Sequence, residues 1–177
     1  LAGPGTILGL PAPASLKLLS TKGSAPFCSL PVRYTDLYSS PSFRKHRCPT
    51  TGQPPAEPAL CLICGALLCA GSECCKRDGL GALTRHAAAE CSEGSGVFLL
   101  LHKCQTVILR GSHAAYWSSP YVDDFGEEDS GLERGRPLKL DPVRLARLRK
   151  MWSGHAVAAA VVKERSTRDR IIRDNYM

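Results

Sequence analysis

The density of cysteine in one short stretch constrains this chain more than any other feature. Residues 61–75, CLICGALLCAGSECC, contain five of the nine cysteines in 177 residues. The full set is Cys28, Cys48, Cys61, Cys64, Cys69, Cys74, Cys75, Cys91 and Cys104. An odd number of cysteines, with no secretory signal sequence at the start, argues against a disulfide framework. Thiolates that bind a metal ion in a reducing compartment explain the clustering better.

The spacing of Cys61 and Cys64 predicts a zinc-binding turn. Two cysteines separated by two residues can bind one ion from a tight turn, and Gly65 directly after them eases that turn. His86 and Cys91 supply a second pair, so the full pattern is C-x2-C-x21-H-x4-C. The sequence therefore predicts one structural Cys3His zinc site. Four protein ligands leave no open coordination position, so we expect no hydrolytic chemistry at this zinc.

The other cysteines of this region form a second candidate set. Its members are Cys48, Cys69, Cys74 and Cys75. If they close around an ion, the chain binds a second Zn²⁺. Adjacent cysteines rarely bind one ion together, so the alternative is that Cys74 or Cys75 is a free thiol.

Three other roles for the cysteines compete with metal binding. Inert buried thiols would not explain seven cysteine and histidine residues between positions 61 and 91. A thioredoxin-like redox pair lacks its βαβ context. A nucleophilic cysteine would need a positioned histidine apart from the ligand-rich region. We therefore expect no catalytic residue in this chain.

The charge distribution indicates which kinds of binding partner the chain can have. The net charge is +7, and residues 133–177 carry 12 Lys and Arg against 5 Asp and Glu, which accounts for the whole excess. A basic C-terminal quarter can meet nucleic acid or an acidic protein surface. Aromatic residues are not interleaved with the charges, which disfavours single-stranded nucleic acid. No apolar run is long enough to span a membrane.

The rest of the pattern predicts an α+β fold, a small zinc-stabilised domain with a short antiparallel sheet and a few helices. We expect a short helix over 31–39, a proline-rich loop over 48–59, and a hairpin of 97–101 with 106–110. A third strand over 114–122, the acidic loop DDFGEEDSG and an edge strand in RGRPLKL follow. The clearest helix begins after Asp141, with Pro142 at its first position and Gly154 after its end.

Several motifs in this order resemble one family. CPTTGQPPAEPALCLICGALLCAGSECC, TRHAAAECSEGSGVFLLL and YWSSPYVDDFGEEDSGLERGRPLKL resemble the C-terminal region of the UBR-box N-recognins, the large E3 ubiquitin ligases of the N-degron (N-end rule) pathway. The ending MWSGHAVAAAVVKERSTRDRIIRDNYM is most similar to the plant and algal Proteolysis-6 type. The resemblance runs from about Leu30 to the C-terminus.

The resemblance implies a role in ubiquitin transfer. The parent ligase would bind N-degron substrates through a UBR box and a ubiquitin-conjugating enzyme through a RING, and neither module is visible here. This segment would be the structural or regulatory zinc-binding C-terminal cap, in contact with other domains of the ligase in the cytoplasm or nucleus. The zinc ligands carry over onto Cys61, Cys64, His86 and Cys91. Plant-type members lack counterparts of Cys69, Cys74 and Cys75, whereas metazoan and fungal members have them.

On this basis we expect three parts: a linker over 1–29, a zinc-binding domain over 30–155 and a basic tail over 156–177. Two alternatives remain. One is a freestanding zinc-binding interaction module that binds nucleic acid through the basic tail. The other is a thiol enzyme.

Overall fold

The computed structural model describes residues 27–70 and 73–167. Most of the expected linker over 1–29, and residues 168–177 of the expected tail, lie outside this part of the chain. The strands are β1 (Pro58–Cys61), β2 (Leu67–Cys69), β3 (Ser95–Leu100), β4 (Gln105–Arg110), β5 (His113–Trp117), β6 (Tyr121–Val122) and β7 (Lys139–Leu140). The helices are α1 (Thr35–Ser39), α2 (Pro41–Lys45), the 3₁₀ turn η1 (Glu73–Cys75), α3 (Ala82–Arg85), the π-helical turn η2 (His86–Cys91), α4 (Pro142–Ser153) and α5 (Val157–Thr167).

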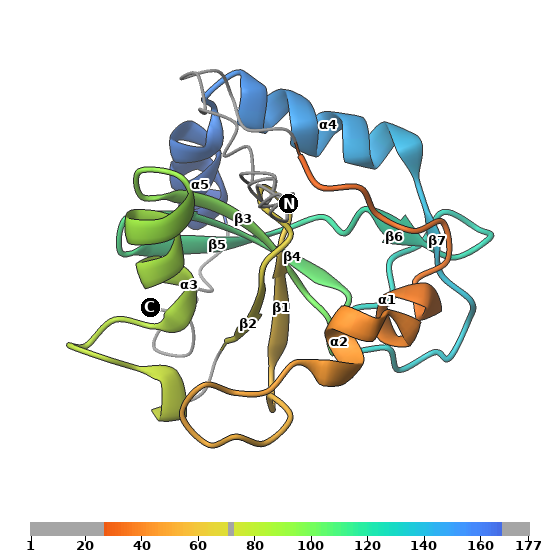
Figure 1. Cartoon of the computed structure of the whole chain (residues 1–177). Coiled ribbons are helices and arrows are strands. Elements are labelled where there is room, and N and C mark those ends of the chain that lie inside the picture. The colour runs from red at the N-terminus through yellow and green to blue at the C-terminus, as the bar shows by residue number, and fades with distance from the viewer. Residues whose placement is uncertain (1–26, 71–72, 168–177) are drawn as a thin grey trace, which may run out of the picture.

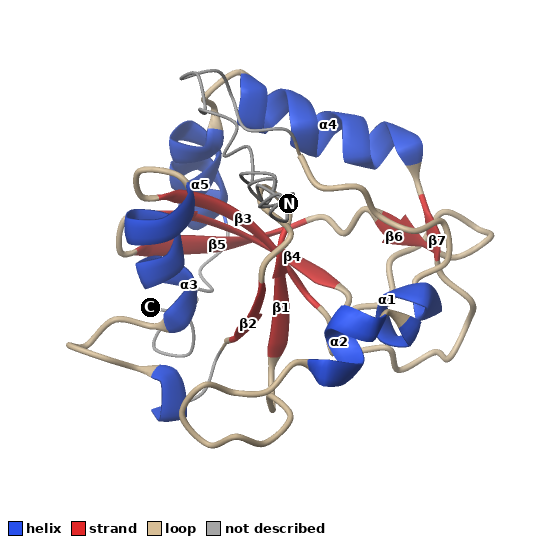
Figure 2. Ribbon diagram, in the orientation of Figure 1, coloured by secondary structure: helices blue, strands red, loops and turns tan. Residues whose placement is uncertain are grey.

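An antiparallel five-stranded sheet in the order β2-β1-β3-β4-β5 forms the centre of the fold (Figures 1 and 2). The expected hairpin is confirmed as β3 and β4, whose register pairs Leu100 with Gln105 around a four-residue turn. The turn begins one residue earlier than expected, at Leu101, whose N–H donates to the carbonyl of Pro58 (2.8 Å). The predicted α+β class, with a short antiparallel sheet and a few helices, is thus confirmed.

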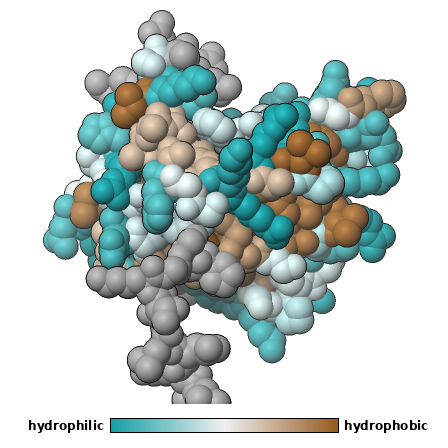
Figure 3. Space-filling view, turned by 90° about the horizontal axis from the view of Figure 1, so that it is seen from above, coloured by the Kyte–Doolittle hydropathy of each residue, from teal (hydrophilic) through white to brown (hydrophobic). Residues whose placement is uncertain are grey.

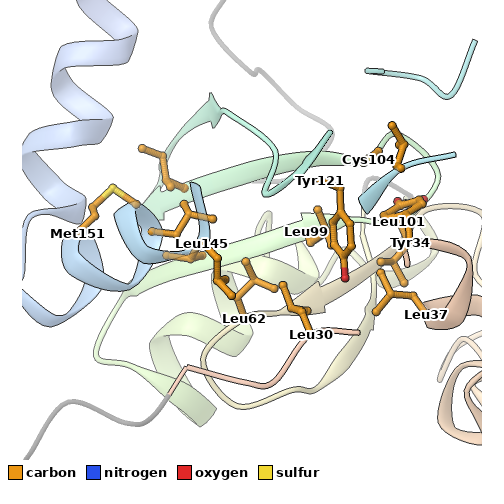
Figure 4. Close-up of a cluster of buried hydrophobic side chains, with 14 of the residues drawn as sticks. Leu30, Tyr34, Leu37, Leu62, Leu99, Leu101, Cys104, Tyr121, Leu145 and Met151 are labelled. Carbon is orange, nitrogen blue, oxygen red and sulfur yellow. The ribbon is translucent and has the colours of Figure 1, made fainter. Parts of the chain in front are cut away.

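Apolar side chains cover both faces of the sheet. In β3, Val97 and Leu99 belong to one buried cluster, whereas Phe98 and Leu100 belong to another. Successive strand residues point to opposite faces, so the unbroken apolar run VFLLL is that of a strand covered on both sides. One cluster includes Leu30, Tyr34, Tyr121 and residues of α4 and α5 (Figure 4). The other is closed by α3, so the fold has three layers.

Helix α4 forms where the sequence predicts it. The Asp141 carboxylate accepts hydrogen bonds from the N–H groups of Val143 (2.7 Å) and Arg144 (3.2 Å), and Pro142 occupies the first turn. This satisfies donors that a helix start otherwise leaves unpaired. Leu145, Leu148 and Met151 are the buried residues of this helix.

Three segments differ from the expectation. Pro41 does not only end the first helix but begins α2, since proline fits the first helical position. The expected third strand over 114–122 divides into β5, which stays in the main sheet, and β6, which pairs with β7. Pro120 lies between them and has no N–H for a strand ladder. The proline-rich loop ends earlier than expected, because β1 begins at Pro58.

Helix α5 lies within the interval that was expected to be a basic tail. Its residues Val157 and Val161 are 1% and 2% exposed, and they pack in the same cluster as α4. No helix among residues 27–70 and 73–167 is long and apolar enough to cross a lipid bilayer.

Candidate metal centres

Four side chains from two separate segments meet at the turn between β1 and β2. They are Cys61, Cys64, His86 and Cys91, the first set expected from the sequence, and one ligand atom from each lies within 4.8 Å of the others. The Sγ atoms of Cys61 and Cys91 are 3.8 Å apart. Cys64 Sγ lies 3.2 Å from Nε2 of His86.

The separation of 3.8 Å fits a tetrahedral zinc ion, and that of 3.2 Å is somewhat shorter than such an ion requires. With Zn–S bonds of about 2.3 Å and a Zn–N bond of about 2.1 Å, the ligand atoms of a tetrahedron lie about 3.6–3.8 Å apart. Three sulfurs and one imidazole nitrogen are also the donor types that zinc selects in structural sites. Both the geometry and the chemistry of the set therefore suit this ion.

Backbone hydrogen bonds shape the turn that carries the first two cysteines. The N–H of Cys61 donates to the carbonyl of Ala66 (2.8 Å), and the N–H of Gly65 donates to the carbonyl of Cys61 (2.9 Å). Gly65 has φ of 77°, in the left-handed region where a side chain would be strained. The glycine after the second cysteine thus serves the turn, as its position in the sequence suggests.

A π-helical turn brings His86 and Cys91 together. In an α-helix, side chains five residues apart point about 140° away from each other. In η2 the N–H of Ser92 instead donates to the carbonyl of Ala87, five residues earlier (3.1 Å), so the turn is wider. The wider turn brings positions five apart to the same side. The four-residue spacing indicated a ligand pair but not the type of turn that joins it.

Glu90 holds the imidazole of His86 in place. Its Oε2 lies 3.0 Å from Nδ1 of His86, and the histidine side chain is only 4% exposed. A carboxylate that accepts a hydrogen bond from Nδ1–H leaves the free lone pair on Nε2. This fixes the tautomer that a metal requires. In this geometry Nε2 is the ring atom that faces Cys64. Sequence reasoning overlooked Glu90, although its position four residues after the histidine could have indicated it.

The second set meets at the opposite end of the β1–β2 hairpin. Ligand atoms of Cys48, Cys69, Cys74 and Cys75 all lie within 4.8 Å of one another. Cys48 Sγ is 3.6 Å from the sulfur of Cys74 and 3.4 Å from that of Cys75. Cys69 Sγ is 3.8 Å from the sulfur of Cys74. These separations also suit a tetrahedral zinc ion with four thiolate ligands.

Cys74 and Cys75 belong to the same cluster although they are adjacent in sequence. Cys74 and Cys75 lie in the 3₁₀ turn η1, and their sulfur atoms are 3.8 Å apart. The structure therefore offers no reason to set one of them aside as the free thiol.

Burial and local hydrogen bonds act on the thiols in opposite directions. Desolvation raises the pKa of Cys61 and Cys91 in the first set and of Cys75 in the second. A hydrogen bond from the side chain of Thr51, with further bonds from the backbone, lowers the pKa of Cys48 to about 6. Zinc binds thiolates, so metal binding at the buried cysteines would release protons.

The two remaining cysteines lie outside both sets. Burial raises the pKa of Cys28 to about 11 and that of Cys104 to about 11. Cys104 is fully buried, and its sulfur is 3.3 Å from Oγ of Ser119. A thiol with a raised pKa is a poor nucleophile, which weighs against the thiol-enzyme alternative.

The acidic loop is neutralised within the chain. Arg134 and Arg136 pair with the carboxylates of Asp123 and Glu127, and Arg134 also reaches Asp129. Lys139 pairs with Asp124 (2.6 Å), and Arg144 pairs with Glu128. The five carboxylates of DDFGEED thus take up four basic residues of the C-terminal quarter. The sequence showed both charge groups but not their pairing.

The fold and its two ligand sets together define a class: a small α+β domain with cysteine and histidine clusters suited to structural zinc. The chain belongs to the Proteolysis_6 C-terminal family, which matches residues 11–154. This confirms the resemblance drawn from the sequence motifs.

Similar proteins include several E3 ubiquitin-protein ligases. The chain is 36% identical to UBR2 of Mus musculus over 146 residues. This aligned region covers 79% of this chain and 8% of UBR2. It is 31% identical over 178 residues to UBR1 of Mus musculus, covering 93% of this chain and 10% of that protein. The ubr3 protein of Danio rerio is 36% identical over 126 residues, or 71% of this chain and 7% of that protein. The chain therefore spans a tenth or less of the length of these relatives.

Proposed function

We propose that this chain is the zinc-stabilised C-terminal cap of an E3 ubiquitin ligase of the N-degron pathway. Cys61, Cys64, His86 and Cys91 hold one Zn²⁺, and Cys48, Cys69, Cys74 and Cys75 hold a second. The observation that carries this proposal is the convergence of two four-ligand sets, each with its ligand atoms within 4.8 Å of one another, in a member of a ligase-related family.

In this proposal the zinc ions have a structural role. Each set joins segments more than twenty residues apart in sequence, so each ion would hold the β1–β2 hairpin to a neighbouring segment: α3 and η2 for the first, the Cys48 loop and η1 for the second. Structural zinc contributes on the order of 10 kcal/mol of apparent binding free energy, which is available to folding. Strands β3, β4 and β5 provide the rest of the apolar sheet, to which this hairpin is joined by the pairing of β1 with β3.

Ubiquitin transfer itself is assigned to parts of the parent ligase outside this chain. A RING-type ligase brings a conjugating enzyme next to a substrate lysine, and this segment supplies no nucleophile. Its partners would be the other domains of the ligase, with the ubiquitin-conjugating enzyme and the N-degron substrate bound elsewhere. The free thiols and thiolates suit the reducing cytoplasm or nucleus.

Metal analysis of the purified chain tests the zinc assignment. We expect two zinc ions per chain by elemental analysis, one after Cys61→Ser and one after Cys69→Ser. Cys28→Ser is the matched control, because Cys28 belongs to neither set, and it should keep both ions. A chain that purifies without zinc and stays folded after exhaustive chelation would contradict the proposal.

Ubiquitin transfer by the full-length parent tests the ligase assignment. The Cys61→Ser change, introduced into the intact ligase, should lower the rate of ubiquitin transfer to an N-degron substrate, while Cys28→Ser should not. An intact parent protein that transfers no ubiquitin, with both zinc sites loaded, would refute the ligase assignment and leave the zinc assignment standing.

The nucleic-acid module is the second candidate, and the structure weakens its basis. Arg134, Arg136, Lys139 and Arg144 supply much of the basic excess, and they already pair with the acidic loop. We expect no salt-dependent affinity for DNA or RNA at physiological ionic strength. An affinity that falls steeply with salt would favour this candidate instead.

A further inference from the structure

A cavity of about 350 Å³, lined by both polar and apolar groups, lies between the two ligand sets. Its walls come from residues 46–50, from β2, and from α3 with the start of η2; α3 and β2 are in contact, and Figure 1 shows them side by side. Cys69 and Cys75 of one set and His86 of the other lie in these walls. Neither zinc assignment gives this cavity a role.

Three arginines line the cavity without a carboxylate partner. They are Arg47, Arg77 and Arg85, and within residues 27–70 and 73–167 no Asp or Glu oxygen lies within 4.0 Å of their nitrogen atoms. Within the same residues, Arg44, Arg110, Arg147 and Arg149 have no such partner either, but none of them lines this cavity. The three arginines are therefore distinguished by their shared position around one cavity.

Two nitrogen atoms in the cavity wall are buried without a hydrogen-bond partner. These are Nε of Arg85 and Nε2 of His46. Arg85 is held from its other end, since Nη2 donates to the carbonyl of Cys75 (2.7 Å). Buried polar atoms in proteins are almost always paired, so a preoriented donor without a partner points to a ligand that supplies an acceptor.

The surrounding charges limit what that ligand can be. Glu90 stands at the cavity, and zinc-bound thiolates would add negative charge from both sides. These charges offset part of the positive field of the arginines and disfavour a polyanion. Guanidinium groups bind a carboxylate through two parallel hydrogen bonds. Leu67, Leu68 and Ala82 add an apolar wall beside the basic one.

The free edge of the sheet indicates that the carboxylate comes from a peptide. The backbone bonds Cys61 to Ala66 and Ala70 to Glu57 set the pairing of β1 with β2, and this turns the N–H and C=O of Leu67 away from β1. No group in the described part of the chain pairs with the backbone of Leu67. A strand edge of this kind binds extended peptide backbone.

We propose that this cavity binds an acidic peptide segment, with one Glu or Asp carboxylate on Arg85 and Arg77 and apolar neighbours against Leu67 and Leu68. This inference does not depend on the ligase assignment.

The test uses the zinc-loaded 177-residue chain and three probes. One is a capped leucine–glutamate–leucine peptide, the second is its glutamine counterpart, and the third is inorganic phosphate. Nuclear magnetic resonance of the arginine Nε–H groups reports on Arg85 directly. We expect the glutamate peptide to shift the Arg85 signal with a saturable dependence on concentration, and the glutamine peptide to bind at least about tenfold more weakly. Equal affinity of the two peptides, or no shift of Arg85, would overturn the proposal. If phosphate shifts the Arg85 signal more strongly than the glutamate peptide does, the ligand of the cavity is a phosphate group and not a peptide carboxylate.

Arg77→Gln provides the sharper variant, because the side chain of Arg77 makes no hydrogen bond or ion pair within residues 27–70 and 73–167. It should weaken the glutamate peptide about tenfold while zinc content stays at the wild-type value. Arg147→Gln is the matched control, since it removes one exposed charge from α4, away from the cavity. If both variants weaken binding equally, the peptide senses only net charge and the cavity is not its site.

Discussion

At the residue scale, Glu90 shows how a side chain outside the ligand set can orient one of the ligands. The Glu90–His86 contact orients a ring that is itself buried. Sequence spacing identified the eight candidate ligands because the chemistry of cysteine and histidine is specific. It did not identify Glu90 as a positioning residue, because the one available signal, a position four residues after His86, is weak for an exposed glutamate on a helical turn.

We predict that Glu90→Gln lowers the zinc affinity of the first set about tenfold, since loss of such a carboxylate typically costs 10–100-fold. The second set should be unaffected. Competition with a chromophoric chelator, which resolves two release steps, measures the effect. Glu93→Gln is the control, and a similar loss in both variants would show that Glu90 has no specific role.

Asp123 gives a prediction about pH. Its carboxylate accepts the N–H groups of Phe125 (2.9 Å) and Glu127 (3.0 Å) and pairs with Arg136 (3.0 Å). The backbone bond to Glu127 is the main cause that lowers the pKa of Asp123, with Arg136 adding to it. A lowered pKa in the folded state stabilises the fold above the unfolded pKa of about 3.9, and this stability is lost as pH falls through the folded value.

We therefore expect Asp123→Asn to destabilise the chain at pH 7 and to differ less from wild type below pH 4. Urea unfolding at both pH values measures the difference. Comparison with Asp124→Asn, an exposed partner of Lys139, controls for net charge. A gap between wild type and Asp123→Asn that does not shrink at low pH would refute the assignment.

At the element scale, the helices and strands that the sequence predicts best are those with the longest sequence patterns. Helix α4 and the β3–β4 hairpin were predicted because each carries several independent signals: a cap, a proline, an apolar period and a bounded turn. Strands β1 and β2 have four and three residues, which are too few to show a period, and Pro58, Cys61 and Cys69 are among them. The π turn η2 was not predictable either, since its wider spacing depends on the ligands that it positions.

The cap of α4 can be tested alone. Asp141→Ala should lower the free energy of unfolding by about 0.5–2 kcal/mol, because two helix N–H groups lose their acceptor. Asp141→Asn keeps a side-chain acceptor and should cost clearly less. Thermal unfolding of the zinc-loaded chain measures both, and equal losses would assign the effect to charge rather than to capping.

At the scale of the whole molecule, the arrangement of surfaces matters more than any single contact. The exposed large apolar side chains among the described residues include Val32 (69%), Phe125 (76%) and Val143 (58%). Figure 3 shows brown, apolar groups gathered on the right of the upper face, on the side where Figure 1 places the start of α4 and the β6–β7 pair. The carboxylates of the acidic loop pair internally, so what this end of the molecule offers to another domain is partly apolar.

The C-terminal boundary of the domain, expected at residue 155, can be probed with neighbouring valines of α5. Val161 is 2% exposed and Val162 is 69% exposed. We predict that Val161→Asp destabilises the fold by about 2 kcal/mol or more, because it places a charge in the apolar cluster. Val162→Asp should change little. If urea unfolding finds both substitutions neutral, α5 is dispensable and the domain ends before it.

The short β1–β2 hairpin lies between the two cysteine clusters, with Cys61 and Cys64 near its turn and Cys69 at its open end. An ion bound at either end would fix that end of the hairpin to its neighbouring segment. Removal of one ion should then raise amide hydrogen exchange at the nearer end of β1 and β2, while the far end stays protected.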